Sequence, residues 1–212
     1  MPHWDEDSPL LRRNLVQAQR AAAAHAMARR KIELATVKAW HKRSMRGLEI
    51  PEAARLGVDP ADLIGEFRGP PKLPWVGVRI GERHGVVSQQ VAAHCEAFMT
   101  TLQPLLVQLD TALQADRLDR LGIDDRRAVA EFAAWAHGEW VRIHPFANGN
   151  GRTARMLGNA ILVRYGLPPV FRLRPRPLGS YATAAVASMD ADHLPMADYV
   201  TDQIDRWEPG RF

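Results

Sequence analysis

The stretch RIHPFANGNGRTARML, residues 142–157, joins two helical patterns through a loop that ends in Gly-Asn-Gly. At residues 149–151 the loop becomes a helix, so free backbone N–H groups and the positive end of the helix dipole converge on one point. Such a point binds anions, and a phosphate is its natural occupant. Arg152 and Arg155 follow on neighbouring parts of the same helix face. The stretch therefore predicts a site for a di- or triphosphate.

His144 lies just before this predicted anion site. Imidazole titrates near neutrality, so His144 is the candidate general base for a hydroxyl group that meets the bound phosphate. Pro145 fixes the backbone, and Phe146 is expected to bury its ring beneath the loop and to support the histidine. Together these groups indicate phosphoryl or nucleotidyl transfer. Taken singly, a histidine or a Gly-Asn-Gly turn is more often structural than functional.

Helical periodicity and cap residues cover most of the chain outside this stretch. The expected helices run from Pro9 to about Arg43, briefly from Asp59, from Ser88 to Leu113 with a kink or a division at Pro104, from Asp124 to His144, from Asn150 to Gly166, and from Ser180 and Pro195 onward. Within them, Arg142 and Arg164 are expected as solvated charges and His137 as a structural residue.

One segment predicts strands instead. Val76, Val78 and Ile80 alternate with other residues before a glycine-bounded turn, which is typical of a β-hairpin. The expected fold class is therefore all-α, a helical domain with one small hairpin before the core helices.

Composition narrows the class of protein. The chain has 212 residues, with 46% hydrophobic and 25% charged residues, which suits one substantial globular domain. No apolar run approaches the roughly 18 residues of a membrane helix, so we expect no membrane association. Cys95 is the one cysteine, which excludes an internal disulfide and favours the cytoplasm. The net charge is only +4, and no nucleic-acid motif accompanies it, so nucleic acid is the least favoured partner.

The motif HPFANGNGRTAR, residues 144–155, resembles the signature of the Fic (Fic/Doc) family. That signature reads His-Pro-Phe, any residue, Asp or Glu, Gly-Asn-Gly-Arg, two residues and Arg, and only Asn148 departs from it. A weaker resemblance extends over about residues 64–204. It implies a Fic-like helical catalytic domain at 64–212, with a hairpin flap near 76–87, and an N-terminal helical extension at 1–63.

The resemblance also implies an activity: transfer of AMP from ATP to a Ser, Thr or Tyr hydroxyl of a target protein, with His144 as general base. It implies that Arg155 lies toward the terminal phosphate and that Phe146 anchors the loop in the core. The residues implied to bind the nucleotide are Gly149, Asn150, Gly151, Arg152 and Arg155, and those implied to align the target by strand addition are Val76, Val78 and Ile80.

Asn148 stands where the family has the acid that holds Mg²⁺. An amide offers one neutral oxygen in place of a charged carboxylate, so Asn148 is at best a weak metal ligand. Mg²⁺ bound mainly through the substrate phosphates remains expected. Two alternatives stay open for this reason: transfer of another nucleotide or phosphate-containing group, and a catalytically silent module that binds a nucleotide or a partner.

The family's self-inhibitory helix is expected to be absent. Its pattern places Gly or Asn directly after a Glu, and none of the glutamates in this chain is followed by either residue. We therefore expect restraint by a separate antitoxin-like partner, as in a toxin–antitoxin pair, or an activity weak enough to be tolerated.

Overall fold

The computed structural model describes residues 1–80, 82–113 and 121–207. In these ranges it is helical, with one two-stranded antiparallel sheet, as the sequence predicts. The elements are α1 (Pro9–Met27), α2 (Leu34–Ser44), α3 (Pro51–Leu56), the 3₁₀ turn η1 (Pro60–Leu63), β1 (Arg79–Ile80), β2 (Arg83–His84), the 3₁₀ turn η2 (Ser88–Gln90), α4 (Val91–Ala112), α5 (Ile123–Ile143), α6 (Asn150–Arg164), α7 (Ser180–Met189) and α8 (Leu194–Asp205).

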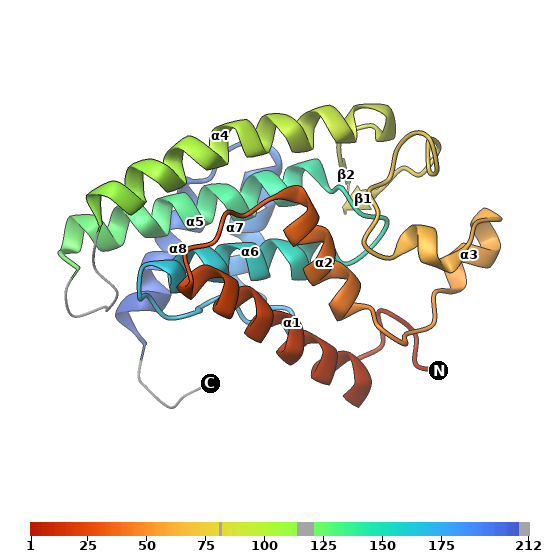
Figure 1. Ribbon diagram of the computed structural model, residues 1–212, viewed down its shortest axis with the longest axis horizontal. Coiled ribbons are helices and arrows are strands. Elements are labelled where there is room, and N and C mark those ends of the chain that lie inside the picture. Colours follow the sequence, from red (N-terminus) through yellow and green to blue (C-terminus); the bar gives the residue numbers. More distant parts are fainter. Residues whose placement is uncertain (81, 114–120, 208–212) are drawn as a thin grey trace.

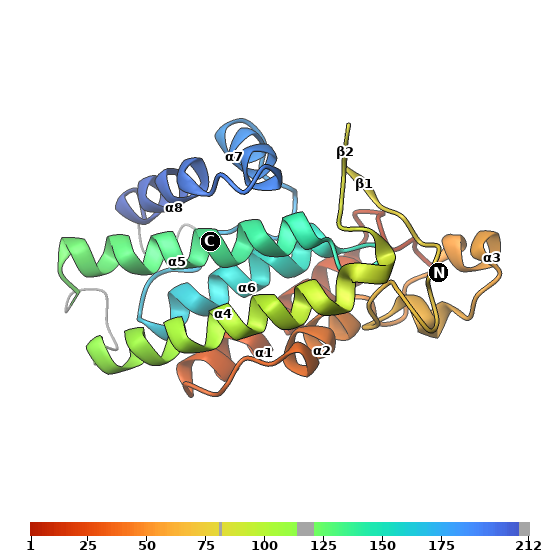
Figure 2. The same cartoon turned by 90° about the horizontal axis from the view of Figure 1, so that it is seen from above.

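Helix α6 forms the centre of the structure, and nearly all of its side chains are buried. It packs against α5 and α1, while α5 also contacts α4, α7 and α8 (Figure 1). Figure 2 shows α7 and α8 on one side of α5 and α6, and α1 and α2 on the opposite side. The apolar stripes that the sequence predicts for α4 and α5 both face this core. The described helices include none with the length and apolar character of a membrane span.

The expected single helix from Pro9 to about Arg43 is wrong. Helix α1 ends at Met27, Arg29 adopts a left-handed conformation with φ 49°, and α2 begins at Leu34. The two helices pack against each other, and Ile32 in the turn between them is fully buried. The alanine-rich sequence contains no Gly or Pro at the break, so the turn is determined by helix pairing rather than by a local breaker.

Helix α4 begins later than expected. The Ser88 hydroxyl donates a hydrogen bond to the Pro74 carbonyl instead of capping the helix, and α4 starts at Val91. Pro104 lies inside the continuous helix and does not divide it. Cys95, on the inner face of α4, is fully buried, and burial raises the pKa of its thiol to about 12.

Arg164 is not the solvated charge that its helical pattern suggests. Its guanidinium is buried and donates to Asp110 on α4, with Nε 2.8 Å from Oδ1. The same group donates to the carbonyl oxygens of Arg29 and Arg30 in the α1–α2 turn, each at 3.0 Å. One side chain thus joins α6, α4 and that turn. By contrast, His137 is buried and hydrogen-bonded to the Tyr181 hydroxyl at 3.0 Å, as expected of a structural residue.

A second hydrophobic cluster lies beside the hairpin and includes Trp4, Met45, Leu63 and Val76. The hairpin forms within the expected range, but its strands are two residues long and pair Arg79 with His84. Val76 and Val78 precede the strands.

Candidate functional site

The loop between α5 and α6 opens on a cavity of about 440 Å³, the size class of small-molecule sites. His144 closes α5 in a left-handed conformation with φ 54°, and Gly149 precedes α6 with φ 76°. These two bends bring the histidine and the first turn of α6 to the same cavity. Residues of the hairpin, the N-terminal segment, the 174–176 region and α7 complete its walls.

The protonation state of His144 follows from its contacts. Its Nδ1 lies 2.8 Å from the carbonyl oxygen of Val141, which can only accept, so Nδ1 carries the proton and Nε2 is left as a base. Burial, with a smaller contribution from the charges of Arg68 and Arg176, lowers the pKa of His144 to about 4. The imidazole is therefore neutral at pH 7 and able to accept a proton.

Asn150 holds the loop instead of offering its side chain to a ligand. Its Oδ1 accepts from the Phe146 N–H at 2.7 Å, and its Nδ2 donates to the Phe146 carbonyl at 2.8 Å. The side chain is buried. The donors left for an anion at this position are backbone N–H groups of the first turn of α6.

Phe146 is fully buried, as the sequence predicts, and stacks on His41 with ring centroids 3.8 Å apart. The Nδ1 of His41 accepts from the Gly65 N–H at 2.9 Å, so its Nε2 carries the proton and donates to the Asn148 carbonyl at 3.0 Å. Burial lowers the pKa of His41 to about 3. Sequence reasoning missed the role of His41 in supporting the loop, because its hydrogen-bond partners Gly65 and Asn148 are 24 and 107 positions away.

Arg68 joins the loop to the hairpin. Its buried guanidinium donates from Nε to the His144 carbonyl at 2.6 Å and from Nη2 to the Ile143 carbonyl at 3.0 Å. The same group also donates to the carbonyl oxygens of Val76 and Val86, on either side of the hairpin. One planar side chain therefore fixes the backbone of His144 relative to the hairpin. Sequence reasoning did not assign Arg68 to the site.

The two glycines of the loop differ in what they require. Gly149 has a positive φ, and a Cβ there would collide with the Met45 side chain. A Cβ at Gly151 would meet only the Nη1 of Arg155, at 3.3 Å. Gly149 is therefore required by the backbone conformation and by packing. Gly151 leaves the start of α6 open to a ligand.

The two motif arginines both line the cavity but point to different partners. Arg152 donates from Nη1 to the Trp4 carbonyl at 2.8 Å, toward the N-terminal segment. Arg155 donates from Nη1 to the Tyr181 hydroxyl at 3.0 Å, toward α7. They flank the start of α6 from two sides.

Three further arginines line the same cavity, namely Arg79, Arg174 and Arg176, and sequence reasoning assigned none of them to the site. The arginine-rich run at 172–176 was the available signal. Asp5 is the only carboxylate among the described lining residues. The cavity therefore carries a strong positive charge, which suits a polyphosphate.

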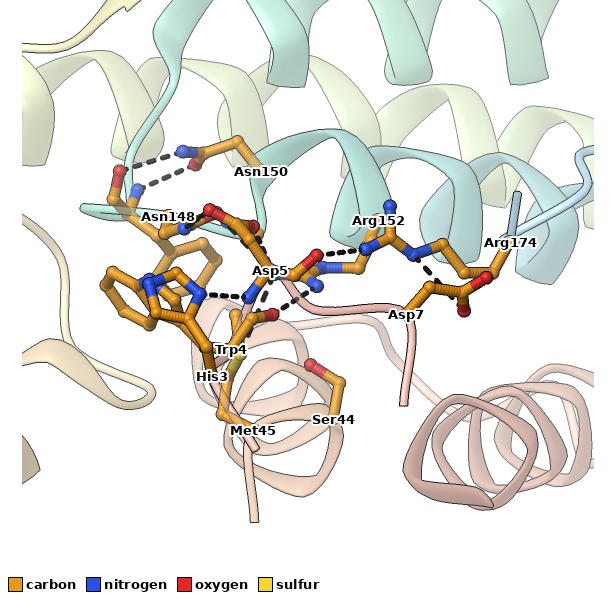
Figure 3. A network of polar contacts seen from close by, with 12 residues as sticks. His3, Trp4, Asp5, Asp7, Ser44, Met45, Asn148, Asn150, Arg152 and Arg174 are labelled. Atoms are coloured by element: carbon orange, nitrogen blue, oxygen red, sulfur yellow. Dashed lines mark hydrogen bonds and ion pairs between the residues drawn. The ribbon is translucent and has the colours of Figure 1, made fainter. Parts of the chain in front are cut away.

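Asn148 also lines the cavity and lies close to Asp5 and Arg152 (Figure 3). Its Oδ1 accepts from the Gly149 N–H and is 3.5 Å from Nη2 of Arg152, so the oxygen faces donors and is poorly placed for a cation. Its Nδ2 donates to Oδ2 of Asp5 at 2.7 Å. The described residues contain no group of three or more His, Cys, Asp or Glu side chains suited to a metal.

The hairpin forms one wall. Val78 and Ile80 line the cavity, whereas Val76 packs in the second hydrophobic cluster. Arg83 on β2 makes a bidentate ion pair with Asp190, at the end of α7. This pair links the hairpin to the end of α7.

Comparison with known proteins gives a family match and similar folds. The model of the Fic/DOC family matches residues 31–162. A curated relative, "Protein adenylyltransferase Fic" of Nematostella vectensis, is 68% identical over 40 residues, which are 19% of this chain and 9% of that protein. The chain thus matches only a small part of that relative's length.

Two solved structures share the fold. Fic-1 (aa134–508) of Caenorhabditis elegans has a TM-score of 0.60 and 22% identity, over 94% of this chain and 50% of that one. BepC, a VirB-translocated effector of Bartonella tribocorum with bound AMPPNP, has a TM-score of 0.55 and 16% identity, over 90% of this chain and 86% of that one.

Proposed function

Because the chain belongs to the Fic/DOC family, we propose that it is a protein adenylyltransferase that moves AMP from ATP to a Ser, Thr or Tyr hydroxyl of a target protein. One observation carries the proposal: a neutral His144 with an unprotonated Nε2 stands beside the open start of α6 in an arginine-lined cavity. A base beside an anion site is what transfer of a phosphate group to a hydroxyl requires.

The proposed step uses these groups in order. Nε2 of His144 takes the proton of the target hydroxyl while the hydroxyl oxygen bonds to the α-phosphorus of ATP. The bond between that phosphorus and the α,β-bridging oxygen breaks, and pyrophosphate leaves with the electron pair. Backbone N–H groups at the start of α6, together with Arg152 and Arg155, stabilise the phosphate charge, with Arg155 toward the terminal phosphate. A divalent cation bound to the phosphates would neutralise further charge.

The hairpin supplies the proposed target surface. Val78 and Ile80 border the cavity next to His144, so a target segment paired with this edge would present its hydroxyl to the base. The expected role of Val76 in this alignment would be indirect, through the packing that supports the hairpin.

The test is a labelling assay with α-³²P-ATP and cell lysate. We expect wild type to label a protein, His144→Ala to lose the label while it still binds nucleotide, and His94→Ala, on α4, to behave as wild type. Label delivered from γ-³²P-ATP instead would show phosphate transfer and contradict the proposal.

Asn148 is the observation that favours a second candidate, transfer of another nucleotide or phosphate-containing group. The motif has Asn148 where the family has an acid, so a cation would be held differently at the phosphates of the donor. A panel of α-labelled nucleotides separates the two candidates. Nucleotide binding with no labelled product from any donor would support a silent binding module.

Several expectations from the sequence remain proposals beside this one. They are a separate antitoxin-like inhibitor, a cytoplasmic location, and a division into an N-terminal extension at 1–63 and a catalytic domain at 64–212. Purification of the untagged protein from its native host, followed by identification of bound proteins, tests the first.

A further inference from the structure

The N-terminal segment, residues 1–7, is built into the site. Trp4 is 1% exposed and belongs to the second hydrophobic cluster. Its N–H donates to the Glu49 carbonyl at 3.0 Å, and its carbonyl accepts from Arg152. These contacts fix the backbone immediately before Asp5 against the motif (Figure 3).

Asp5 itself is held from several sides. Its N–H donates to Nδ1 of His3 at 3.0 Å, and its carbonyl accepts from the guanidinium of Arg174. Its Oδ2 accepts from Nδ2 of Asn148 at 2.7 Å, and Oδ1 is 3.6 Å from Arg152. The side chain is nevertheless 56% exposed and lines the cavity. The carboxylate is therefore oriented by its neighbours and still open to a ligand.

The position of this carboxylate is informative. An asparagine side chain has nearly the shape of an aspartate, so the Asn148 amide marks where an acid at that position would place its oxygens. The Asp5 carboxylate lies one hydrogen bond, 2.7 Å, from that place. The negative charge that the motif lacks thus reaches the cavity from 143 positions away in the sequence.

We infer that Asp5 is the protein ligand for a divalent cation that accompanies the nucleotide, and that Asn148 orients it. The inference rests on the proposed function, because phosphate oxygens and water supply the remaining ligands. Mg²⁺ is commonly bound in this way, by one or two carboxylates and the substrate phosphates. The amide of Asn148 and the guanidinium of Arg152 then act as outer-shell groups that hold the carboxylate in place.

The same contacts permit an opposite role. Asp5 sits among donors, so its carboxylate would compete with a phosphate if it served as an internal anion. The two roles predict opposite signs: loss of the charge weakens cation-dependent nucleotide binding if Asp5 is a ligand, and strengthens nucleotide binding if Asp5 is a competitor.

The experiment is calorimetric titration with α,β-methylene-ATP, with Mg²⁺ or with EDTA. The variants are Asp5→Asn, Asn148→Asp, and the double variant that exchanges the two side chains. We expect Mg²⁺ to tighten binding to wild type. This gain should fall about tenfold or more in Asp5→Asn and return in the exchanged variant, which has a carboxylate at 148. Mn²⁺ titration followed by EPR, in the presence of the analogue, measures the cation directly.

Tighter binding by Asp5→Asn, or a Mg²⁺ effect that Asp5→Asn leaves unchanged, would overturn the inference. Urea unfolding of each variant controls for altered folding. His144→Ala separates the two proposals: it should keep the Asp5-dependent cation effect while it loses transfer. Cation binding that depends on Asp5, in a wild-type protein that labels no target, would reject the proposed function and leave this inference standing.

Discussion

At the scale of single residues, one backbone carbonyl determines which nitrogen of His144 can act. The neutral form is the proposed base, and the lowered pKa of His144, about 4, keeps that form populated well below pH 6. The acid limb of the reaction should therefore lie near pH 4 instead of near the ordinary value of about 6.5. Single-turnover labelling from pH 8 to pH 4.5 should then show no loss of rate centred near 6.5. An acid limb centred near 6.5 would contradict this assignment.

Helix α6 contains two asparagines that do the same local work at different places. Asn150 bonds both backbone groups of Phe146, and Asn159 bonds both backbone groups of Phe171, with each of these two bonds at 2.8 Å. Replacing either with alanine leaves buried backbone groups unpaired, which should lower the free energy of unfolding by about 1–3 kcal/mol.

The pair provides a matched control. Asn150→Ala should also reduce the labelling rate more than Asn159→Ala does, because only the first loosens the loop that carries His144. Urea denaturation and single-turnover rates measure the two effects. Equal rates in the two variants would show that the hydrogen bonds of Asn150 are not needed to hold the loop.

At the scale of elements, the hairpin and the motif loop depend on one side chain. Arg68→Lys keeps the charge but loses the planar fork that reaches four carbonyl oxygens. We expect a loss of at least about 2 kcal/mol in the free energy of unfolding, together with a lower labelling rate.

The control for that substitution is Arg13→Lys, at an exposed position on α1. It should leave both the urea midpoint and the labelling rate unchanged. If Arg68→Lys matched this control, water or neighbouring groups would be able to replace the fork.

Element boundaries show where sequence patterns are sufficient. The stripes of α4 and α5 and the end of α6 just before Gly166 follow from local periodicity and from the left-handed glycine, and they were predicted. The turn between α1 and α2 was not, since an alanine-rich run is a good helix at every position and only tertiary pairing bends it. The prediction of Ser88 as a cap was wrong for a related reason, because its hydroxyl donates to the Pro74 carbonyl instead.

At the scale of the whole molecule, three buried histidines couple stability to pH. Burial lowers the pKa values of His41 and His137 to about 3 and that of His144 to about 4. In the unfolded chain each takes up a proton near pH 6.5, so stability is complete above that pH and falls as the pH decreases. Between pH 7.5 and 5.5 each histidine should lower the free energy of unfolding by about 1.4 kcal/mol, and the three together by about 4 kcal/mol.

Urea unfolding at the two pH values measures this loss. His137→Gln should reduce the loss by about one third, whereas His84→Gln, at an exposed position, should not change it. A loss below about 1 kcal/mol in wild type would mean that these side chains are protonated in the native protein.

In the site, too, local sequence patterns predict residues that are close in sequence but not contacts between distant segments. The motif predicted the candidate base, the start of α6 and both arginines that line the cavity, because these lie within twelve consecutive residues, 144–155. His41, Arg68 and Asp5 reach the loop from distant segments, and no local pattern distinguishes them from ordinary polar residues. Their roles depend on how α2, the hairpin and the N-terminal segment pack.

The burial of Cys95 has a practical consequence. It is the one thiol in the chain and lies in the core on the inner face of α4, with its reactive thiolate disfavoured. A thiol reagent can modify it only in molecules whose core has opened. The rate of modification in native buffer therefore reports the frequency of that opening without any engineered probe, and the same reaction can time the exposure of α4 in every variant discussed above.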